Sequence, residues 1–157
     1  AAYSAAISAC EKGYQWARAL ALLAEAQQRR GPGLDTAAFN AAASACEKGQ
    51  QWMRALCILA DMQQKSTEPN IITYNAVISS FEKGQQWARA IRLLAEMRKS
   101  GFHADAISYN AAVGACKDVQ QWEQALSLMA DMEQHLLAPN VMTYNASLRA
   151  CELGQLW

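Results

Sequence analysis

Apolar residues recur along this chain with the spacing of amphipathic helices. In the segment 71–83, Tyr74, Val77, Ile78 and Phe81 fall at i, i+3, i+4 and i+7, which places them on one helix face. A second stripe with helical spacing follows and comprises Trp87, Ala90, Ile91, Leu94 and Met97. Gly84 separates the stripes and is typical of a helix end, so the pattern predicts two antiparallel helices joined by a tight turn.

This helix pair is repeated along the chain. The five tryptophans, at 16, 52, 87, 122 and 157, are spaced by 36, 35, 35 and 35 residues. A period of this size indicates stacked repeats, because one hairpin cannot bury both of its stripes alone. The sequence therefore predicts an all-α fold, an α-solenoid forming a right-handed superhelix of antiparallel helix-turn-helix repeats.

The repeats occupy about 1–35, 36–70, 71–105 and 106–140, with a partial repeat at 141–157, and we expect all of 1–157 to form one array. The chain opens and stops inside repeat motifs, so we interpret it as part of a longer array. The fourth repeat carries Val119 where the others have glycine, and we expect its first helix to end less cleanly.

Composition argues against several classes of protein. The 14 Lys and Arg residues balance 14 Asp and Glu residues, so the basic footprint usual in nucleic-acid-binding proteins is absent, which lowers the RNA affinity we expect. No segment approaches the ~20 apolar residues of a membrane-spanning helix. His103 and His135 have no acidic or nucleophilic partners at recurrent positions, so we expect no enzyme.

The cysteines do not indicate a metal site. Four of the five, at 10, 46, 116 and 151, occupy one position of successive repeats, and none forms a C-x-x-C pair. Equivalent helices of neighbouring hairpins lie roughly 8–10 Å apart or more, whereas a disulfide needs Cα atoms within ~7 Å. We therefore expect small buried thiols, with no metal and no cofactor.

Each repeat opens with an aromatic residue, followed by asparagine in all but the first, and two repeats close with Pro-Asn. The opening motifs are TYN at 73–75 and 143–145, SYN at 108–110 and FN at 39–40; the closing motifs are PN at 69–70 and 139–140. With a period of 35 residues, the whole chain resembles the pentatricopeptide repeat family. Tetratricopeptide repeats run at about 34 residues and open with W-x2-L-G-x2-Y, a motif that this chain lacks.

The resemblance implies a single-stranded RNA-binding module of an RNA-processing or RNA-expression factor in a chloroplast or mitochondrion. The family binds one base per repeat through two or three side chains. We expect a monomer whose partner is single-stranded RNA, with other proteins as further partners and no membrane.

The resemblance also assigns roles to residues. The first base-contacting residue follows the aromatic and the second closes the repeat, which gives four recognition pairs: Ser4 with Asp35, Asn40 with Asn70, Asn75 with Asp105, and Asn110 with Asn140. Asn145 would begin a fifth pair. Base-flanking positions, two residues before the aromatic, hold Ile72, Ile107 and Met142, whereas Ala37 is small.

Lysines at the end of the first helices match a position that the family uses against phosphate. These are Lys12, Lys48 and Lys83; the fourth and fifth repeats have Asp118 and Leu153 there. The alternative interpretation is that these lysines only interact with the exposed carbonyls of the last helical turn.

The chemistry of the recognition pairs predicts base preferences. An ionised Asp only accepts hydrogen bonds and suits the ring N–H of uracil or guanine, whereas an Asn can rotate its amide and donate to cytosine. Ser4 leaves room for a purine, and Asn in its place favours a pyrimidine. The predicted target is 5′-G-C/U-U-C/U-3′, in agreement with the usual code of the family.

Two alternatives stay open. Asn and Asp before a helix are good N-caps, so Asp35, Asn70, Asp105 and Asn140 could serve only as caps. The array could also be a protein-binding scaffold like a tetratricopeptide array, with no role in RNA binding, and the zero net charge is the best argument for it.

Overall fold

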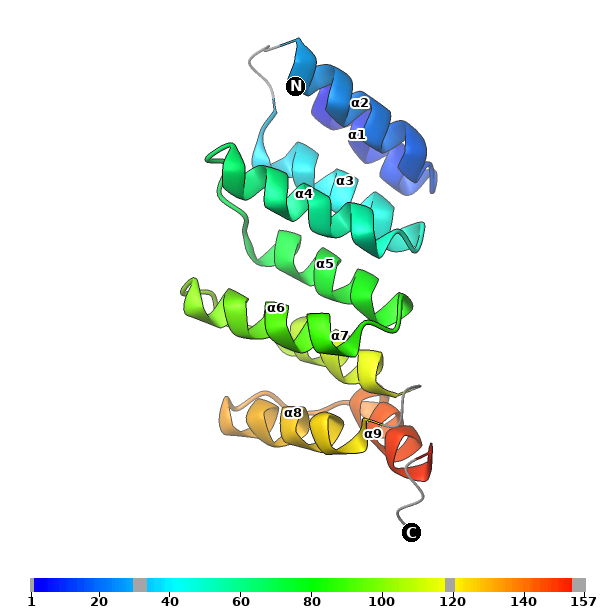
Figure 1. Cartoon of the computed structure of the whole chain (residues 1–157), viewed down its shortest axis with the longest axis vertical. Coiled ribbons are helices and arrows are strands. Elements are labelled where there is room, and N and C mark those ends of the chain that lie inside the picture. The colour runs from blue at the N-terminus through cyan, green and yellow to red at the C-terminus, as the bar shows by residue number, and fades with distance from the viewer. Residues whose placement is uncertain (1, 30–33, 118–120, 154–157) are drawn as a thin grey trace. The chain divides into compact units, whose positions relative to one another are not determined.

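The computed structural model describes residues 2–29, 34–117 and 121–153. Within these ranges the secondary structure is entirely α-helical and comprises nine helices (Figure 1). They are α1 (Ala2–Lys12), α2 (Trp16–Gln28), α3 (Thr36–Lys48), α4 (Trp52–Gln64), α5 (Ile71–Lys83), α6 (Trp87–Lys99), α7 (Ala106–Cys116), α8 (Trp122–Gln134) and α9 (Val141–Leu153). None of the described helices is long and apolar enough to cross a membrane.

The chain divides into two compact units, residues 1–80 and 81–157, each of which is described by itself. In the first unit, α1 packs on α2 and on α3, and α3 packs on α4. In the second, α7 packs on α6, α8 and α9. Helices α1 and α7 thus each contact the second helix of their own repeat and the first helix of the next repeat, as in an α-solenoid. The predicted all-α repeat class is confirmed, and the right-handed superhelix stays a prediction.

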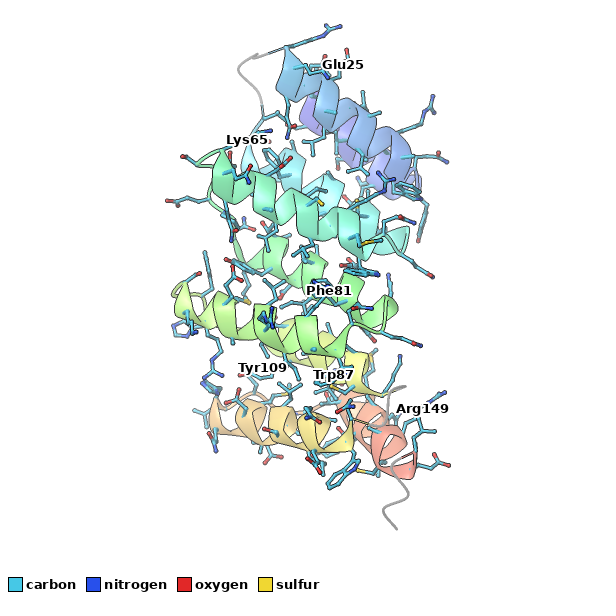
Figure 2. The ribbon with its side chains drawn as sticks, viewed as in Figure 1. Glu25, Lys65, Phe81, Trp87, Tyr109 and Arg149 are labelled. Carbon is cyan, nitrogen blue, oxygen red and sulfur yellow. The ribbon has the colours of Figure 1, made fainter. Side chains whose placement is uncertain are left out.

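The predicted apolar stripe of the third repeat forms the core. Tyr74, Val77, Ile78 and Phe81 are each no more than 2 % exposed. On α6, Ala90, Leu94 and Met97 are buried as predicted, but Leu93 is buried and Ile91 only half-buried. In contrast to these buried apolar residues, the charged side chains of Lys65 and Arg149 project from the ribbon (Figure 2). Helical periodicity therefore located the core with an error of one residue on the second helix.

The turns of the first three hairpins share one backbone conformation. The residue with positive φ is the one after the glycine position: Tyr14 at 56°, Gln50 at 56° and Gln85 at 54°. Gly49 itself has a φ of −84°. A Cβ atom at Gly49 would lie 2.2 Å from Cδ1 of Trp16, so close approach of the indole ring requires glycine here. The glycine marks the helix end as predicted, and the left-handed conformation belongs to the residue after it.

The ends of α6 and α7 differ from each other. Gly101 follows the C-cap of α6 with a φ of 87°, the left-handed conformation expected of a helix-stopping glycine. Helix α7 has 11 residues, against 13 in α3 and α5. The altered turn of the fourth repeat lies at 118–120, outside the described residues, so its effect stays a prediction.

The tryptophans that mark the period begin the second helices. Trp16, Trp52, Trp87 and Trp122 are the first residues of α2, α4, α6 and α8, and all four are half-buried. Trp157 lies outside the described residues. On α6, Trp87 is therefore less buried than Ala90, Leu94 and Met97 of the same predicted stripe.

The cysteines are free, and their environments differ. Cys46 and Cys116 are 0 % exposed, and burial raises the pKa of each thiol to about 11. Cys10 and Cys151 are half-buried and Cys57 is exposed, so the expectation of buried thiols is confirmed for two of the four equivalent positions. Within the part of the chain that the structure describes, no cluster of His, Cys, Asp or Glu is arranged to hold a metal ion.

Candidate nucleic-acid interface

The aromatic residue that opens the second, third and fourth repeats faces the core, whereas Tyr144 of the partial fifth repeat is 48 % exposed. Phe39, Tyr74 and Tyr109 are 1 %, 2 % and 1 % exposed, so their rings are not available for a base to stack on. The next residue lies about 100° further around the helix, as the 3.6-residue turn requires. Anchoring the aromatic in the core therefore fixes the direction in which the adjacent recognition residue points.

The two residues of the first recognition pair are hydrogen-bonded to each other. Ser4 Oγ donates to Asp35 Oδ1 over 3.0 Å, and the Ala38 backbone N–H donates to the same oxygen over 3.0 Å. The Ala38 N–H bond, with a further contribution from the Ser4 hydroxyl, lowers the pKa of Asp35 below its ordinary value. Asp35 is thus both the N-cap of α3 and an ionised partner of Ser4, so capping and pairing are not exclusive alternatives.

The second pair is joined directly. Asn40 Nδ2 donates to Asn70 Oδ1 over 3.1 Å, and the Thr73 hydroxyl donates to Asn40 Oδ1 over 2.5 Å. Asn70 Oδ1 also accepts from the backbone N–H groups of Ile72 at 3.1 Å and Thr73 at 3.2 Å. Asn40 is only 8 % exposed, and Asn70 is half-buried. Asn70 therefore caps α5 through its oxygen while its Nδ2 group takes no part in these bonds.

The fourth pair is joined through a threonine. The Thr143 hydroxyl donates to Asn110 Oδ1, and the Thr143 backbone N–H donates to Asn140 Oδ1 over 3.0 Å. Asn145, the first residue of the fifth predicted pair, is exposed on α9.

The third predicted pair is divided between the two units. Asn75 belongs to residues 1–80 and Asp105 to residues 81–157. Asp105 forms a capping box with Ser108, whose backbone N–H donates to Asp105 Oδ1 over 3.0 Å. The capping interpretation thus holds for this residue, and its pairing with Asn75 stays a prediction.

Large apolar side chains face solvent at the base-flanking position. Ile72, Ile107 and Met142 are 55 %, 59 % and 70 % exposed. In the second unit, a cavity of about 240 Å³ brings Met142 together with Asn110 and Asn145. Exposed apolar residues beside polar ones at a constant repeat position are suited to holding flat, partly apolar groups such as nucleobases.

The phosphate-contacting lysines differ in their surroundings. Lys12 and Lys83 are exposed. Lys48 is half-buried, with Nζ 3.0 Å from Glu11 Oε1 and 5.6 Å from the centre of the Tyr14 ring. Lys48 is therefore partly neutralised by the preceding repeat.

Two cations that the repeat pattern did not select line the 240 Å³ cavity. Lys117 lies 3.6 Å from Glu82, and Arg149 is exposed on α9. Arg149 follows the recognition residue Asn145 by four positions, one helical turn along the same face. The other repeats have Ser8, Ser44, Ser79 and Gly114 at this position. Comparing this position across the repeats could have identified Arg149 from the sequence, because only the fifth repeat has a charged residue there.

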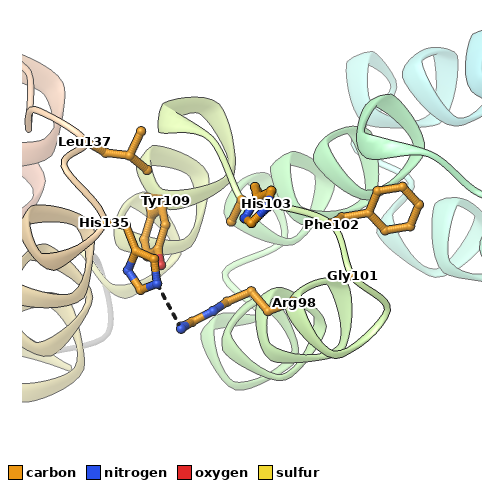
Figure 3. A pocket seen from close by; sticks show the side chains of 8 residues that line it. Arg98, Gly101, Phe102, His103, Tyr109, His135 and Leu137 are labelled. Atoms are coloured by element: carbon orange, nitrogen blue, oxygen red, sulfur yellow. Dashed lines mark hydrogen bonds between the residues drawn. The ribbon is translucent and has the colours of Figure 1, made fainter.

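A second polar cluster joins the helices of the fourth repeat to α6 (Figure 3). The Tyr109 hydroxyl donates to Asp131 Oδ2 over 2.7 Å, and Arg98 Nη1 lies 2.7 Å from the same oxygen. Arg98 Nη2 lies 3.2 Å from His135 Nε2. Burial, and then the Asp131 carboxylate, raises the pKa of Tyr109 to about 12. The cluster borders a cavity of about 340 Å³ and ties α6, α7 and α8 together.

Sequence comparisons identify the family. Profiles described as the PPR repeat family match residues 69–118 and 104–152, and one for the pentatricopeptide repeat domain matches residues 22–83. The chain belongs to the pentatricopeptide repeat family. No curated protein sequence matches it significantly.

Solved structures of this family have a similar fold. The maize pentatricopeptide repeat protein PPR10, in complex with an 18-nt psaJ RNA element, aligns with a TM-score of 0.78 and 28 % identity over 92 % of this chain. The PPR domain of Arabidopsis thaliana protein-only RNase P 1, in complex with tRNA, aligns with a TM-score of 0.81 and 21 % identity. The alignment covers 95 % of this chain and 78 % of that one. Nuclear proteinaceous RNase P 2 of A. thaliana aligns with a TM-score of 0.84 and 17 % identity. The alignment covers 97 % of this chain and 34 % of that one. This chain spans 21 % of PPR10.

Proposed function

We propose that this chain is a single-stranded RNA-binding module that recognises one base per repeat, with the preference 5′-G-C/U-U-C/U-3′. The observation that carries the proposal is the joining of first and second recognition residues within a unit, as Asn40 Nδ2 donates to Asn70 Oδ1 over 3.1 Å. The PPR10 complex with RNA, at 28 % identity, supports the ligand class.

Each pair suits its proposed base through donors and acceptors. Asp35, ionised and bonded to Ser4, offers only acceptors, which suits the ring N–H of guanine, and the short serine leaves space for the purine. Asn40 fills more of that space in the next repeat, which favours a pyrimidine. Asp105 with Asn75 would favour uracil at the third base on the same reasoning.

The module would belong to an organellar RNA-processing or RNA-expression factor of a chloroplast or mitochondrion. Family membership supports this part of the proposal. We assign no catalytic role to this chain, and its similarity to RNase P 1 is to the PPR domain of that protein.

The alternative, a protein-binding scaffold, rests on the zero net charge and on the pairing of Lys48 with Glu11. It does not account for Ile72, Ile107 and Met142, which are exposed beside polar pairs once per repeat. A peptide groove would more often contain clusters of Lys and Arg or a continuous apolar trough.

A direct binding measurement tests the proposal. We expect the chain to bind 5′-GCUC in a single-stranded oligonucleotide with a Kd that is roughly micromolar or weaker. Stacking at about 1–3 kcal/mol per base must exceed an association cost of at least ~4 kcal/mol. An oligonucleotide of the same length with purines at the second and fourth bases is the control. Equal affinity for both, or none for either, would contradict base recognition and favour the scaffold.

Replacing Lys12, Lys48 and Lys83 together by alanine tests the backbone contacts. We expect weaker binding of every RNA by the same factor and a flatter salt dependence, because phosphate contacts release counterions irrespective of sequence. Fluorescence anisotropy titrations at several salt concentrations measure both effects. Lys48→Ala alone should matter less than Lys12→Ala, because Glu11 already pairs with Lys48 at 3.0 Å. Loss of binding for one RNA sequence only would show that these lysines contact bases.

A further inference from the structure

We propose that Thr73, and in the second unit Thr143, is a positioning residue for base specificity. The inference rests on the proposed function, since it concerns how an Asn–Asn pair distinguishes cytosine from uracil. Thr73 is 0 % exposed and lies directly before the core aromatic Tyr74, so its hydroxyl cannot itself contact RNA. Its effect passes through the amide of Asn40.

The orientation of the Asn70 amide follows from the backbone. One side-chain atom of Asn70 lies 3.1 Å from the Ile72 N and 3.2 Å from the Thr73 N. Backbone N–H groups can only donate, so this atom must be Oδ1. The other atom of the amide is therefore Nδ2, a group with two N–H donors.

The orientation of Asn40 follows from that of Asn70. The Asn40 atom 3.1 Å from Asn70 Oδ1 must be a donor, so it is Nδ2, and Oδ1 faces Thr73. The Thr73 hydroxyl accepts from the Asn70 backbone N–H over 3.1 Å. Its single hydrogen has two acceptors in reach, Asn40 Oδ1 at 2.5 Å and Asn70 Oδ1 at 3.2 Å, and the shorter contact is the one to Asn40. The ring of bonds closes only if both amides turn their oxygens away from the base.

The pair consequently offers only N–H donors at the groove. Cytosine has a bare acceptor nitrogen at ring position 3, whereas uracil has an N–H there that would oppose another donor. From the sequence we expect a recognition Asn to be free to rotate its amide. Here the Asn40 amide is instead fixed in one orientation. The Thr73 hydroxyl and Asn70 Oδ1 together hold Asn40 in the orientation that favours cytosine.

The second unit repeats the arrangement. The Thr143 hydroxyl accepts from the Asn140 backbone N–H over 3.1 Å and donates to Asn110 Oδ1. Where the second recognition residue is aspartate, threonine is absent: Ala38 follows Asp35, and Ser108 follows Asp105 by the same three positions. Ala38 has no hydroxyl, whereas the Ser108 hydroxyl donates to Asp105 Oδ1 over 3.0 Å. A carboxylate offers acceptors whichever way it turns, so what it presents to a base does not depend on this hydroxyl.

Thr73→Val tests the proposal, because valine has nearly the same shape and lacks the hydroxyl. Asn40 Oδ1, in a side chain only 8 % exposed, would lose its donor, and a buried unpaired carbonyl is costly. Only the bond to Asn70 Oδ1 would then hold the Asn40 amide, so we expect the side chain to rotate out of this bond and bring its unpaired oxygen to the groove, where it can accept from uracil. We expect the affinity ratio of 5′-GCUC to 5′-GUUC to fall by about fivefold, the equivalent of one hydrogen bond.

Thr73→Ser and Thr143→Val are the matched controls. Serine keeps the hydroxyl, and Ser108 at the equivalent position accepts from the Asp105 backbone N–H over 3.2 Å, so Thr73→Ser should keep the wild-type ratio. Thr143→Val should change the preference at the fourth base, measured with 5′-GCUC against 5′-GCUU, and leave the second base unchanged. Thermal melting of each variant monitors folding.

The outcomes separate the two proposals. If the wild-type protein has no base preference, the proposed function fails and the inference fails with it. If the wild type prefers cytosine at the second base and Thr73→Val lowers affinity for both RNAs alike, the proposed function stands, and Thr73 is only structural. A changed ratio at the second base for Thr73→Val, absent from Thr73→Ser, supports the inference.

Discussion

Replacing Phe39 by alanine should lower the free energy of unfolding by about 3–5 kcal/mol, the usual cost of removing a fully buried aromatic ring. Phe39 is 1 % exposed, and it lies among buried alanines of α3, which include Ala38, Ala42 and Ala43, each 0 % exposed. Small side chains cannot expand to fill the space left by the ring, so we expect the cavity to persist. Urea unfolding followed by circular dichroism measures the change.

Two variants make the Phe39 result specific. Met53→Ala removes a large apolar side chain that is 64 % exposed on α4, and it should change stability by no more than about 0.5 kcal/mol. Phe39→Tyr should be tolerated. Tyr3 and Tyr109 donate to Glu25 and Asp131, each 22 residues further along, and Asp61 stands 22 residues after Phe39. Equal losses for Phe39→Ala and Met53→Ala would contradict the role of the aromatic as the core anchor.

Most of the fold could be predicted from the periodic spacing of apolar residues. The stripes at 3.6-residue spacing located the helices and the core, because one face of each helix must be buried wherever the helix lies. The 35-residue period then gave the order of packing, since equivalent helices of successive repeats meet. Both the 3.6-residue and the 35-residue spacing are regular patterns, and a single sequence shows them directly.

The details of the candidate interface depend on contacts between residues more than 30 positions apart. The Thr73 hydroxyl reaches Asn40 in the preceding repeat, and Lys48 reaches Glu11. Periodicity identifies which position a residue occupies but not which of its atoms faces a neighbouring repeat. The sequence therefore predicted the members of the recognition pairs, but not the direction of the amides.

Gly49 illustrates the same limit within a hairpin turn. The left-handed residue of this turn is Gln50, with a φ of 56°, and not the glycine before it. The glycine is needed because the ring of Trp16, from the preceding repeat, occupies the place of a Cβ atom, 2.2 Å away. Backbone preference and steric space both select glycine, and only the structure distinguishes them.

Asn70→Asp should move the preference at the second base from cytosine toward uracil. A carboxylate has nearly the shape of the amide, and one of its oxygens can keep the bonds now made by Asn70 Oδ1 to Asn40 Nδ2 and the Thr73 N–H. The only group that changes is the amide Nδ2, a donor, which is replaced by a carboxylate oxygen, an acceptor. Facing cytosine it meets a ring acceptor, and facing uracil it gains a charge-assisted bond from the ring N–H.

The expected size of the Asn70→Asp effect is about 1–2 kcal/mol in the ratio of affinities for 5′-GCUC and 5′-GUUC, flanked identically. Asp and Asn cap helices about equally well, so the stability of α5 should barely change and cannot mimic the effect. Asn140→Asp provides the matched control, because it should produce the same shift at the fourth base and none at the second. If Asn70→Asp leaves the C-to-U ratio as in the wild type, Asn70 serves only as a cap, and one-base recognition fails at this repeat.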